Sequence, residues 1–186
     1  MTTPDKPDVD TATIRETYSV GLNVWTTCLP DPKELELLRC TLAGHVGLLV
    51  PEVTDVAARM RGEIRRTAVH VIVRAHQVLE DGAGADPVAR ACHVQDLAVT
   101  SRALLNLYCN PGPLGSPTGH EEIEESVRRK VCGACSKPIA DGDRYERAVF
   151  AADSSGGIRG YRHTGACPAS QQTSNPCSAR TRRARR

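Results

Sequence analysis

Aromatic residues are scarce in this sequence, which has one Trp, one Phe and four Tyr among its 186 residues. A large core must therefore be built from aliphatic side chains. These are available, since hydrophobic residues make up 40% of the chain, and a share of that size argues against disorder of the whole chain. Tyr145, Phe150 and Tyr161 lie near one another in the last third, where they predict a small core of their own.

The sequence also lacks a long hydrophobic run. A membrane-spanning helix needs roughly 20 consecutive apolar residues, and no stretch of the chain approaches that length. The first ten residues, MTTPDKPDVD, are polar and acidic and show no feature of a secretory signal. We therefore expect a cytoplasmic protein with no membrane contact, in which the eight cysteines are thiols or metal ligands rather than disulfides.

Motifs of catalysis are missing as well. HEEIEE at 120–125 has the first His and the Glu of a metalloprotease helix, but Glu124 stands where the second His belongs. DGAGAD at 81–86 lacks the Lys of a phosphate-binding loop, so it is interpreted as a turn. No nucleophile elbow occurs either. The sequence identifies no catalytic and no cofactor-binding residues, and it favours a protein that is not an enzyme.

The formal net charge of +2 hides an uneven distribution. Residues 1–115 carry 11 Lys and Arg against 14 Asp and Glu. Residues 116–167 carry equal numbers of positive and negative side chains, so their net charge is zero. The excess of positive charge sits in five tail residues, Arg180, Arg182, Arg183, Arg185 and Arg186. A second basic stretch, which we interpret as a solvated helix face, comprises Arg59, Arg61, Arg65, Arg66 and Arg74.

Helix signals dominate the first two thirds. Asp31 can cap a helix that has Pro32 at its first position and Glu34 completing a capping box. Apolar residues then recur at helical spacing, namely Leu35, Leu38, Leu42, Val46 and Leu49. We expect this helix to continue, kinked, through Pro51. Further long helices are predicted over 63–80 and 87–109, and a short one over 12–19.

These patterns predict a mainly α protein, an antiparallel bundle of three long helices followed by a small α+β zinc-binding module. The bundle domain should span residues 12–110, after a disordered leader at 1–11. Residues 111–118 should form a linker, and residues 119–168 a helix plus the zinc module. Residues 169–186 should form a disordered, Arg-rich tail.

The predicted zinc ligands are Cys132, Cys135, His163 and Cys167. Two cysteines three positions apart let one tight turn aim both sulfurs at one point, with Gly133 permitting the turn's conformation. Two strands, 144–150 and 158–162, separate this pair from His163 and Cys167, which we place on one face of a helical turn. Four ligands leave no open position, so the predicted zinc ion is structural.

Several alternatives stay open. Cys177 or His120 can replace one of the four ligands, and the cysteine pair can act as a redox pair, although the βαβ context of thioredoxin is absent. The other cysteines are expected to be small buried hydrophobes, and they are Cys28, Cys40, Cys92 and Cys109. The histidines of the predicted helices are dispersed and indicate no second metal or catalytic cluster; they are His45, His70, His76 and His93.

Two resemblances complete the sequence analysis. Residues 130–168 resemble the treble-clef and zinc-ribbon families, although Pro168 disfavours a helix directly after Cys167. The segment LAGHVGLLVPEV at 42–53, with the third long helix, resembles an uncharacterised family, domain of unknown function 6415. That family is labelled a natural product biosynthesis protein, and the resemblance implies a link to bacterial secondary metabolism without an assigned reaction.

Three functions follow as hypotheses. The first is a non-catalytic, zinc-stabilised accessory module that binds another protein. The second is a nucleic-acid-binding regulator that uses the zinc module and the Arg tail to hold phosphates. The third is a natural-product tailoring enzyme, with His45 and Glu52 of the resembling segment as the residues to test.

Overall fold

The structure is a computed structural model that describes residues 9–25, 30–150, 158–165 and 167. Within these ranges the chain forms five helices followed by four short strands. It divides into two compact units, which we call the helical unit (Met1–Arg128) and the C-terminal unit (Arg129–Arg186). No helix in the described part is long and apolar enough to cross a membrane.

Helix α1 (Thr11–Leu22) is longer than the sequence indicates and belongs to the bundle. Its N-cap is Asp10, whose side chain accepts hydrogen bonds from the backbone N–H groups of Ala12 and Thr13. Val9, just before the cap, is buried. The predicted leader over residues 1–11 therefore extends too far, because its last residues cap the first helix and contribute to the core. Residues 1–8 lie outside the described ranges.

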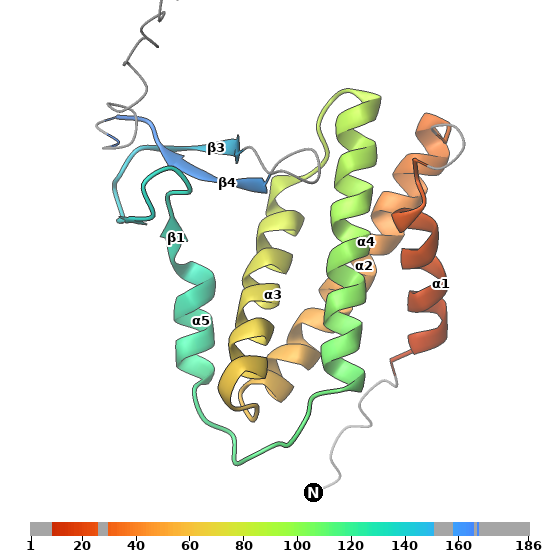
Figure 1. The fold of residues 1–186 in the computed structure, drawn as a ribbon. Coiled ribbons are helices and arrows are strands. Elements are labelled where there is room, and N and C mark those ends of the chain that lie inside the picture. The colour runs from red at the N-terminus through yellow and green to blue at the C-terminus, as the bar shows by residue number, and fades with distance from the viewer. Residues whose placement is uncertain (1–8, 26–29, 151–157, 166, 168–186) are drawn as a thin grey trace, which may run out of the picture. The chain divides into compact units, whose positions relative to one another are not determined.

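Helix α2 (Pro32–Ala57) begins as predicted, with a capping box between Asp31 and Glu34. It continues through Pro51 as one helix, and its buried face extends the predicted apolar stripe through Val53 to Ala57. Helix α3 (Gly62–Asp81) and helix α4 (Pro87–Cys109) also lie close to their predicted bounds. In Figure 1, α3 and α4 run in opposite directions and α2 crosses them obliquely.

Helix α4 is the centre of the helical unit, since it packs against α1, α2 and α3. Its buried residues therefore cover more than one face of the helix, and they include Ala91, Val94, Leu97, Ala98, Leu104 and Leu107. The expectation of three long helices is corrected accordingly: α1 packs with them as a fourth helix, and α5 adds a fifth.

Helix α5 (His120–Arg128) packs on α3 and α2 and belongs to the helical unit. The segment before it, predicted to be a linker, is bound to the junction between α2 and α3. Gly115 N–H donates to Arg59 O at 2.8 Å, and Thr118 N–H donates to Ala58 O at 2.9 Å. The grouping of this helix with the predicted zinc module is therefore corrected: the boundary between units follows Arg128.

The C-terminal unit is built from two small antiparallel sheets. Strand β1 (Lys130–Val131) pairs with β2 (Pro138–Ile139), a pairing that the sequence did not indicate. Strand β3 (Tyr145–Phe150) pairs with β4 (Ile158–His163), with Tyr145 opposite His163, close to the predicted strands. Residues 169–186, the predicted tail, lie outside the described ranges, as do residues 151–157.

Candidate metal centre

Four side chains of the C-terminal unit converge, and they are the four that the sequence singled out. Cys132 follows β1, Cys135 lies in the turn after it, His163 ends β4, and Cys167 lies shortly beyond. One sulfur or ring nitrogen from each lies within 4.8 Å of those of all the others. Together the four side chains could hold a metal ion.

The turn that carries the cysteine pair is closed by backbone hydrogen bonds. Cys132 N–H donates to Lys137 O at 2.9 Å, and Ser136 N–H donates to Cys132 O at 2.8 Å. The residue with a positive φ in this turn is Ser136, at 57°. Gly133 therefore has a different role from the one predicted: a Cβ on it would sit 2.5 Å from Cε2 of Phe150. The glycine makes room for the ring.

The cysteine turn is also attached to the β3–β4 hairpin. Gly133 N–H donates to Tyr161 O at 2.8 Å, beside a bridge between Cys132 and Tyr161. Tyr161 is buried and meets Tyr145 edge-on, with ring centroids 5.5 Å apart. The amino group of Lys130 lies 5.4 Å and 5.9 Å from the centroids of the same two rings. The predicted aromatic core thus fixes the turn on strand β4.

His163 and Cys167 are brought together by a strand end and a bend, rather than by the predicted helical turn. Thr164 N–H donates to Arg144 O at 3.0 Å, so the pairing with the β3 side continues past His163. Cys167 N–H then donates to Gly165 O at 2.8 Å. Their spacing of four residues fits a helix, but the ladder with the preceding hairpin strand fixes the backbone instead.

The distances fit a tetrahedral site. Cys132 Sγ lies 3.8 Å from Cys167 Sγ, and Cys135 Sγ lies 3.6 Å from His163 Nδ1. Metal–sulfur bonds of about 2.3 Å and metal–nitrogen bonds of about 2.0 Å give tetrahedral edges of about 3.8 Å between sulfurs and about 3.5 Å between sulfur and nitrogen. The two ligand pairs are spaced as such a centre requires.

Burial and hydrogen bonding prepare the sulfurs for this role. Cys132 and Cys167 are fully buried, whereas Cys135 is partly exposed. Burial opposes ionisation of Cys132, but backbone N–H groups of His163, Cys135 and Ala134 stabilise its thiolate and lower its pKa to about 6. Because the thiolate is the form that binds metal, these N–H groups favour coordination.

A carboxylate stands behind the imidazole. His163 Nε2, the nitrogen that faces away from Cys135, lies 3.9 Å from Asp143 Oδ2. That oxygen also accepts a hydrogen bond from the backbone N–H of Ala140 at 2.9 Å, which holds the carboxylate in its turn. The distance from Asp143 is longer than a hydrogen bond, so the carboxylate lies near the ring without fixing the position of its proton.

The alternative ligands lie elsewhere or outside the described residues. His120 lies on α5, with its Nε2 3.6 Å from Asp55 Oδ1, and Cys177 is not among the described residues. Within the described part, the group of four is the only one in which three or more His, Cys, Asp or Glu side chains converge in this way. The dispersed histidines of the helical unit accordingly form no second cluster there.

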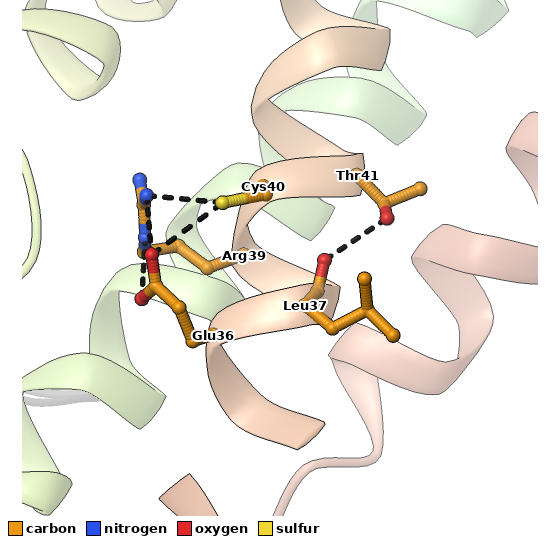
Figure 2. A network of polar contacts seen from close by, with 5 residues as sticks. All are labelled: Glu36, Leu37, Arg39, Cys40 and Thr41. Carbon is orange, nitrogen blue, oxygen red and sulfur yellow. Dashed lines mark hydrogen bonds and ion pairs between the residues drawn. The ribbon is translucent and has the colours of Figure 1, made fainter. Parts of the chain in front are cut away.

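The cysteines outside this group differ in how far their side chains are exposed. Cys40 and Cys109 are exposed, Cys92 is partly buried, and Cys28 lies outside the described residues. The expectation that they are buried hydrophobes is wrong for Cys40 and Cys109. Cys40 lies beside an ion pair, with its sulfur 3.3 Å from an Arg39 nitrogen and 3.4 Å from Glu36 Oε1 (Figure 2).

The basic stretch of the helical unit is used within the chain. Arg59 and Arg61 donate to the carbonyls of Gly115 and Ser116. The other three arginines pair with carboxylates, and the pairs are Arg65 with Glu122, Arg66 with Glu63, and Arg74 with Asp96. This corrects the interpretation as a solvated face for Arg59, Arg61, Arg65 and Arg74, which bond to other elements. Arg66 pairs with Glu63 on its own helix, and both side chains are exposed. The Arg tail at 180–186 lies outside the described residues.

Comparison with known proteins gives one match. A profile described as a family of unknown function, DUF6415, matches residues 12–113. The matched segment covers α1 to α4, whereas the four converging ligands lie beyond it. No curated protein and no solved structure shows detectable similarity to the chain.

Proposed function

Because the chain belongs to DUF6415, a family without an assigned function, we propose a role that rests on its own residues: a non-catalytic protein-interaction module whose C-terminal unit is held together by a structural zinc ion. The observation that carries the interaction is an exposed apolar groove in the helical unit. The observation that supports the zinc ion is the ligand group of Cys132, Cys135, His163 and Cys167.

Zinc suits the donor set. Three thiolates and one imidazole match the soft, tetrahedral preference of Zn²⁺. Four protein ligands complete the coordination and leave no position for a reacting water, so the ion serves the fold. The C-terminal unit has few buried hydrophobic side chains of its own among its described residues, namely Cys132, Tyr161 and Cys167. A metal then supplies much of the stability that such a small unit lacks.

Native mass spectrometry of the reduced chain tests the zinc ion. We expect one zinc ion per wild-type chain and none in the Cys132→Ser/Cys135→Ser variant. A Cys40→Ser/Cys109→Ser variant is the matched control, because it removes two exposed thiols outside the ligand group and should keep its zinc. Wild type that purifies without metal, or with a redox-active metal in place of zinc, would contradict the proposal.

The groove lies between α1 and α2 and has a volume of about 470 Å³. Its apolar wall is formed by Val20, Pro30, Leu37 and Leu38. Val20 is 56% exposed and Leu37 is 71% exposed, the highest value among the large hydrophobic residues described. Figure 2 shows that Leu37 and the Arg39 ion pair project from opposite sides of α2. Grouped apolar exposure of this kind is typical of a contact surface.

The acidic residues that line the groove indicate the charge of the partner that would bind there. Among the described residues that line it, the charged ones are Glu16 from α1 and Glu34 from α2, both acidic. Electrostatic complementarity therefore favours a partner segment that places apolar side chains in the groove and a Lys or Arg beside them. We commit to such a basic-flanked apolar peptide segment of another protein as the occupant.

Selection from a displayed peptide library tests the groove directly. We expect enrichment of sequences that combine apolar residues with Lys or Arg, and loss of their binding in Leu37→Asp. Glu16→Gln should weaken binding, since it removes one carboxylate and keeps the shape. The control is Val88→Asp, which adds the same charge at an exposed position in the first turn of α4. Peptides that bind Leu37→Asp as well as wild type would exclude this groove.

A link to bacterial secondary metabolism is part of the proposal through the family resemblance of residues 42–53. Deletion of the gene should change the profile of secreted metabolites. If a gene carrying Leu37→Asp restores the wild-type profile in the deletion strain, the link to metabolism does not depend on the groove. An unchanged profile after deletion would remove the link and leave the interaction module standing.

A further inference from the structure

A second hollow of the helical unit lies on the other side of α1, against α4. It has a volume of about 310 Å³. Polar side chains dominate its lining. They are Arg15 and Tyr18 from α1, and Arg102, Asn106, Cys109 and Asn110 from α4 and its C-cap. The hollow falls wholly within the segment matched by the family profile. It shares no lining residue with the apolar groove.

Among the described residues that line this hollow, two are positively charged and none is negatively charged. Arg15 contacts Thr11 Oγ1 at 3.4 Å and Cys109 Sγ at 3.8 Å, neither of which is a carboxylate. The Arg102 side chain has no hydrogen bond or ion pair with another described residue. Arg65, Arg66 and Arg74, by contrast, each have an acidic partner. The two guanidinium groups of the hollow are therefore available to an anion.

A purely structural role does not account for Arg102. A cation stabilises a helix C-terminus within the last turn, where the partial negative charge of the helix dipole is felt. Arg102 lies seven residues before Cys109, the last residue of α4, which is about two turns away. Its side chain is exposed and does not fill the core. With these two structural roles excluded, the Arg102 guanidinium group is a surface charge that lines the hollow.

From this geometry we infer that the α1–α4 hollow binds a small ligand through a phosphate monoester group. A guanidinium group presents paired N–H donors that match phosphate oxygens, and two of them balance a charge close to −2. The lining adds neutral donors. Asn106 Oδ1 accepts a hydrogen bond from Asn110 Nδ2 at 3.1 Å, so the Asn106 amide turns its own N–H groups to other partners. Tyr18 adds a hydroxyl group beside them.

The size of the hollow limits the ligand. Pockets for small molecules start at about 300 Å³, so a volume of about 310 Å³ accepts a phosphate with a small organic group. The other hollow rich in cations, between the start of α2 and the loop after α3, is a weaker candidate. Its Arg39 is already bound to Glu36 (Figure 2), and its Arg90 donates to Ala85 O.

The test is an NMR titration of the full chain with inorganic phosphate at constant ionic strength. We expect saturable shifts of backbone amide signals in α1 and in the second half of α4. The dissociation constant should rise tenfold or more in Arg102→Gln and in Arg15→Gln. Arg102→Lys should lie in between, because it keeps the charge and loses the paired donors. The control is Arg66→Gln, which removes a positive charge elsewhere on the surface and should bind as wild type does.

Two further measurements make the outcome decisive. Binding should weaken as the pH falls from about 8.5 to about 5.5, since inorganic phosphate gains a proton near neutral pH and its charge falls from about −2 to about −1. The melting temperature of Arg102→Gln should equal that of wild type, which separates a lost contact from a lost fold. Equal shifts with sodium chloride, equal affinity for acetate, or unchanged affinity in Arg102→Gln would each overturn the inference.

Discussion

Gly133 lies directly against the ring of Phe150, so that a Cβ on the glycine would sit 2.5 to 2.9 Å from three ring carbons. The contact joins the turn that carries Cys132 and Cys135 to the last residue of β3. It explains the glycine between the two cysteines by packing, because its backbone does not adopt a positive φ. The cysteine turn and the hairpin therefore have to assemble together.

Gly133→Ala should destabilise the C-terminal unit. The added methyl group pushes the Phe150 ring away, and overpacking of this kind costs about 1 to 3 kcal/mol. The measurement is an NMR titration with a chelator. The chelator concentration at which the backbone signals of the hairpin disappear should be lower in Gly133→Ala than in wild type. Gly165→Ala is the matched control, since its Cβ would meet nothing within 4 Å. If the two variants behave alike, the contact with Phe150 does not stabilise the unit.

A similar comparison is available in the helical unit. Gly21 of α1 is buried where three helices meet, and a Cβ there would lie 2.8 Å from Ala98 Cβ and 2.9 Å from Leu42 Cδ1. Gly21→Ala should lower the free energy of unfolding by about 1 to 3 kcal/mol. Gly44→Ala on α2, where the Cβ meets open space, should raise it by about 0.5 to 1 kcal/mol. Urea unfolding measures both, and stabilisation of both would show that α1 packs more loosely than described.

The ion pair in Figure 2 predicts an acid-resistant carboxylate. Hydrogen bonds from Arg39 to both oxygens of Glu36, at 2.9 and 2.7 Å, lower the pKa of Glu36 to about 2, with a smaller contribution from the Cys40 thiol. A lowered carboxyl pKa stabilises the folded state above the ordinary value of 4.5, and this contribution is lost as the pH falls towards 2. Because the Glu36 side chain is 49% exposed, solvent screening keeps that contribution below about 1 kcal/mol.

Carboxyl-carbon NMR titration should therefore place the Glu36 midpoint near pH 2 in wild type. Arg39→Met should return the midpoint to the range of an ordinary glutamate. Arg128→Met serves as the control, because it breaks the pair with Glu124 on α5 instead and should leave Glu36 unchanged. A wild-type midpoint above pH 4 would mean that the pair does not persist in solution.

Local signals were predictable from the sequence wherever neighbouring residues determine the structure. The starts of α2 and α4 follow from an aspartate cap and a proline in first position, which act within one turn. The four converging ligands followed from residue type and spacing, because a metal site needs particular atoms more than a particular fold. The strands of the hairpin were likewise found to within a residue of their bounds.

The missed features depend on residues far apart in the sequence. Hydrophobic spacing gives a helix one buried face, but α4 is covered by three other helices and buries several. Composition marked residues 111–118 as a linker, yet hydrogen bonds to Arg59 and Ala58 bind the segment to the bundle. A basic run was interpreted as solvated because the carboxylate partners of two of its arginines, Glu122 for Arg65 and Asp96 for Arg74, lie on other helices.

The sequence by itself determined the helical class, the starts of α2 and α4, and which four Cys and His side chains lie close together. Caps, periodicity and residue spacing act over short distances along the chain. The tertiary structure alone decided that Ser136 takes the positive φ, that Gly133 makes room for Phe150, and that a strand end presents His163. It also placed Arg15 and Arg102 around one hollow whose described lining contains no carboxylate. These features arise from packing and pairing between distant segments, and no local pattern encodes such contacts.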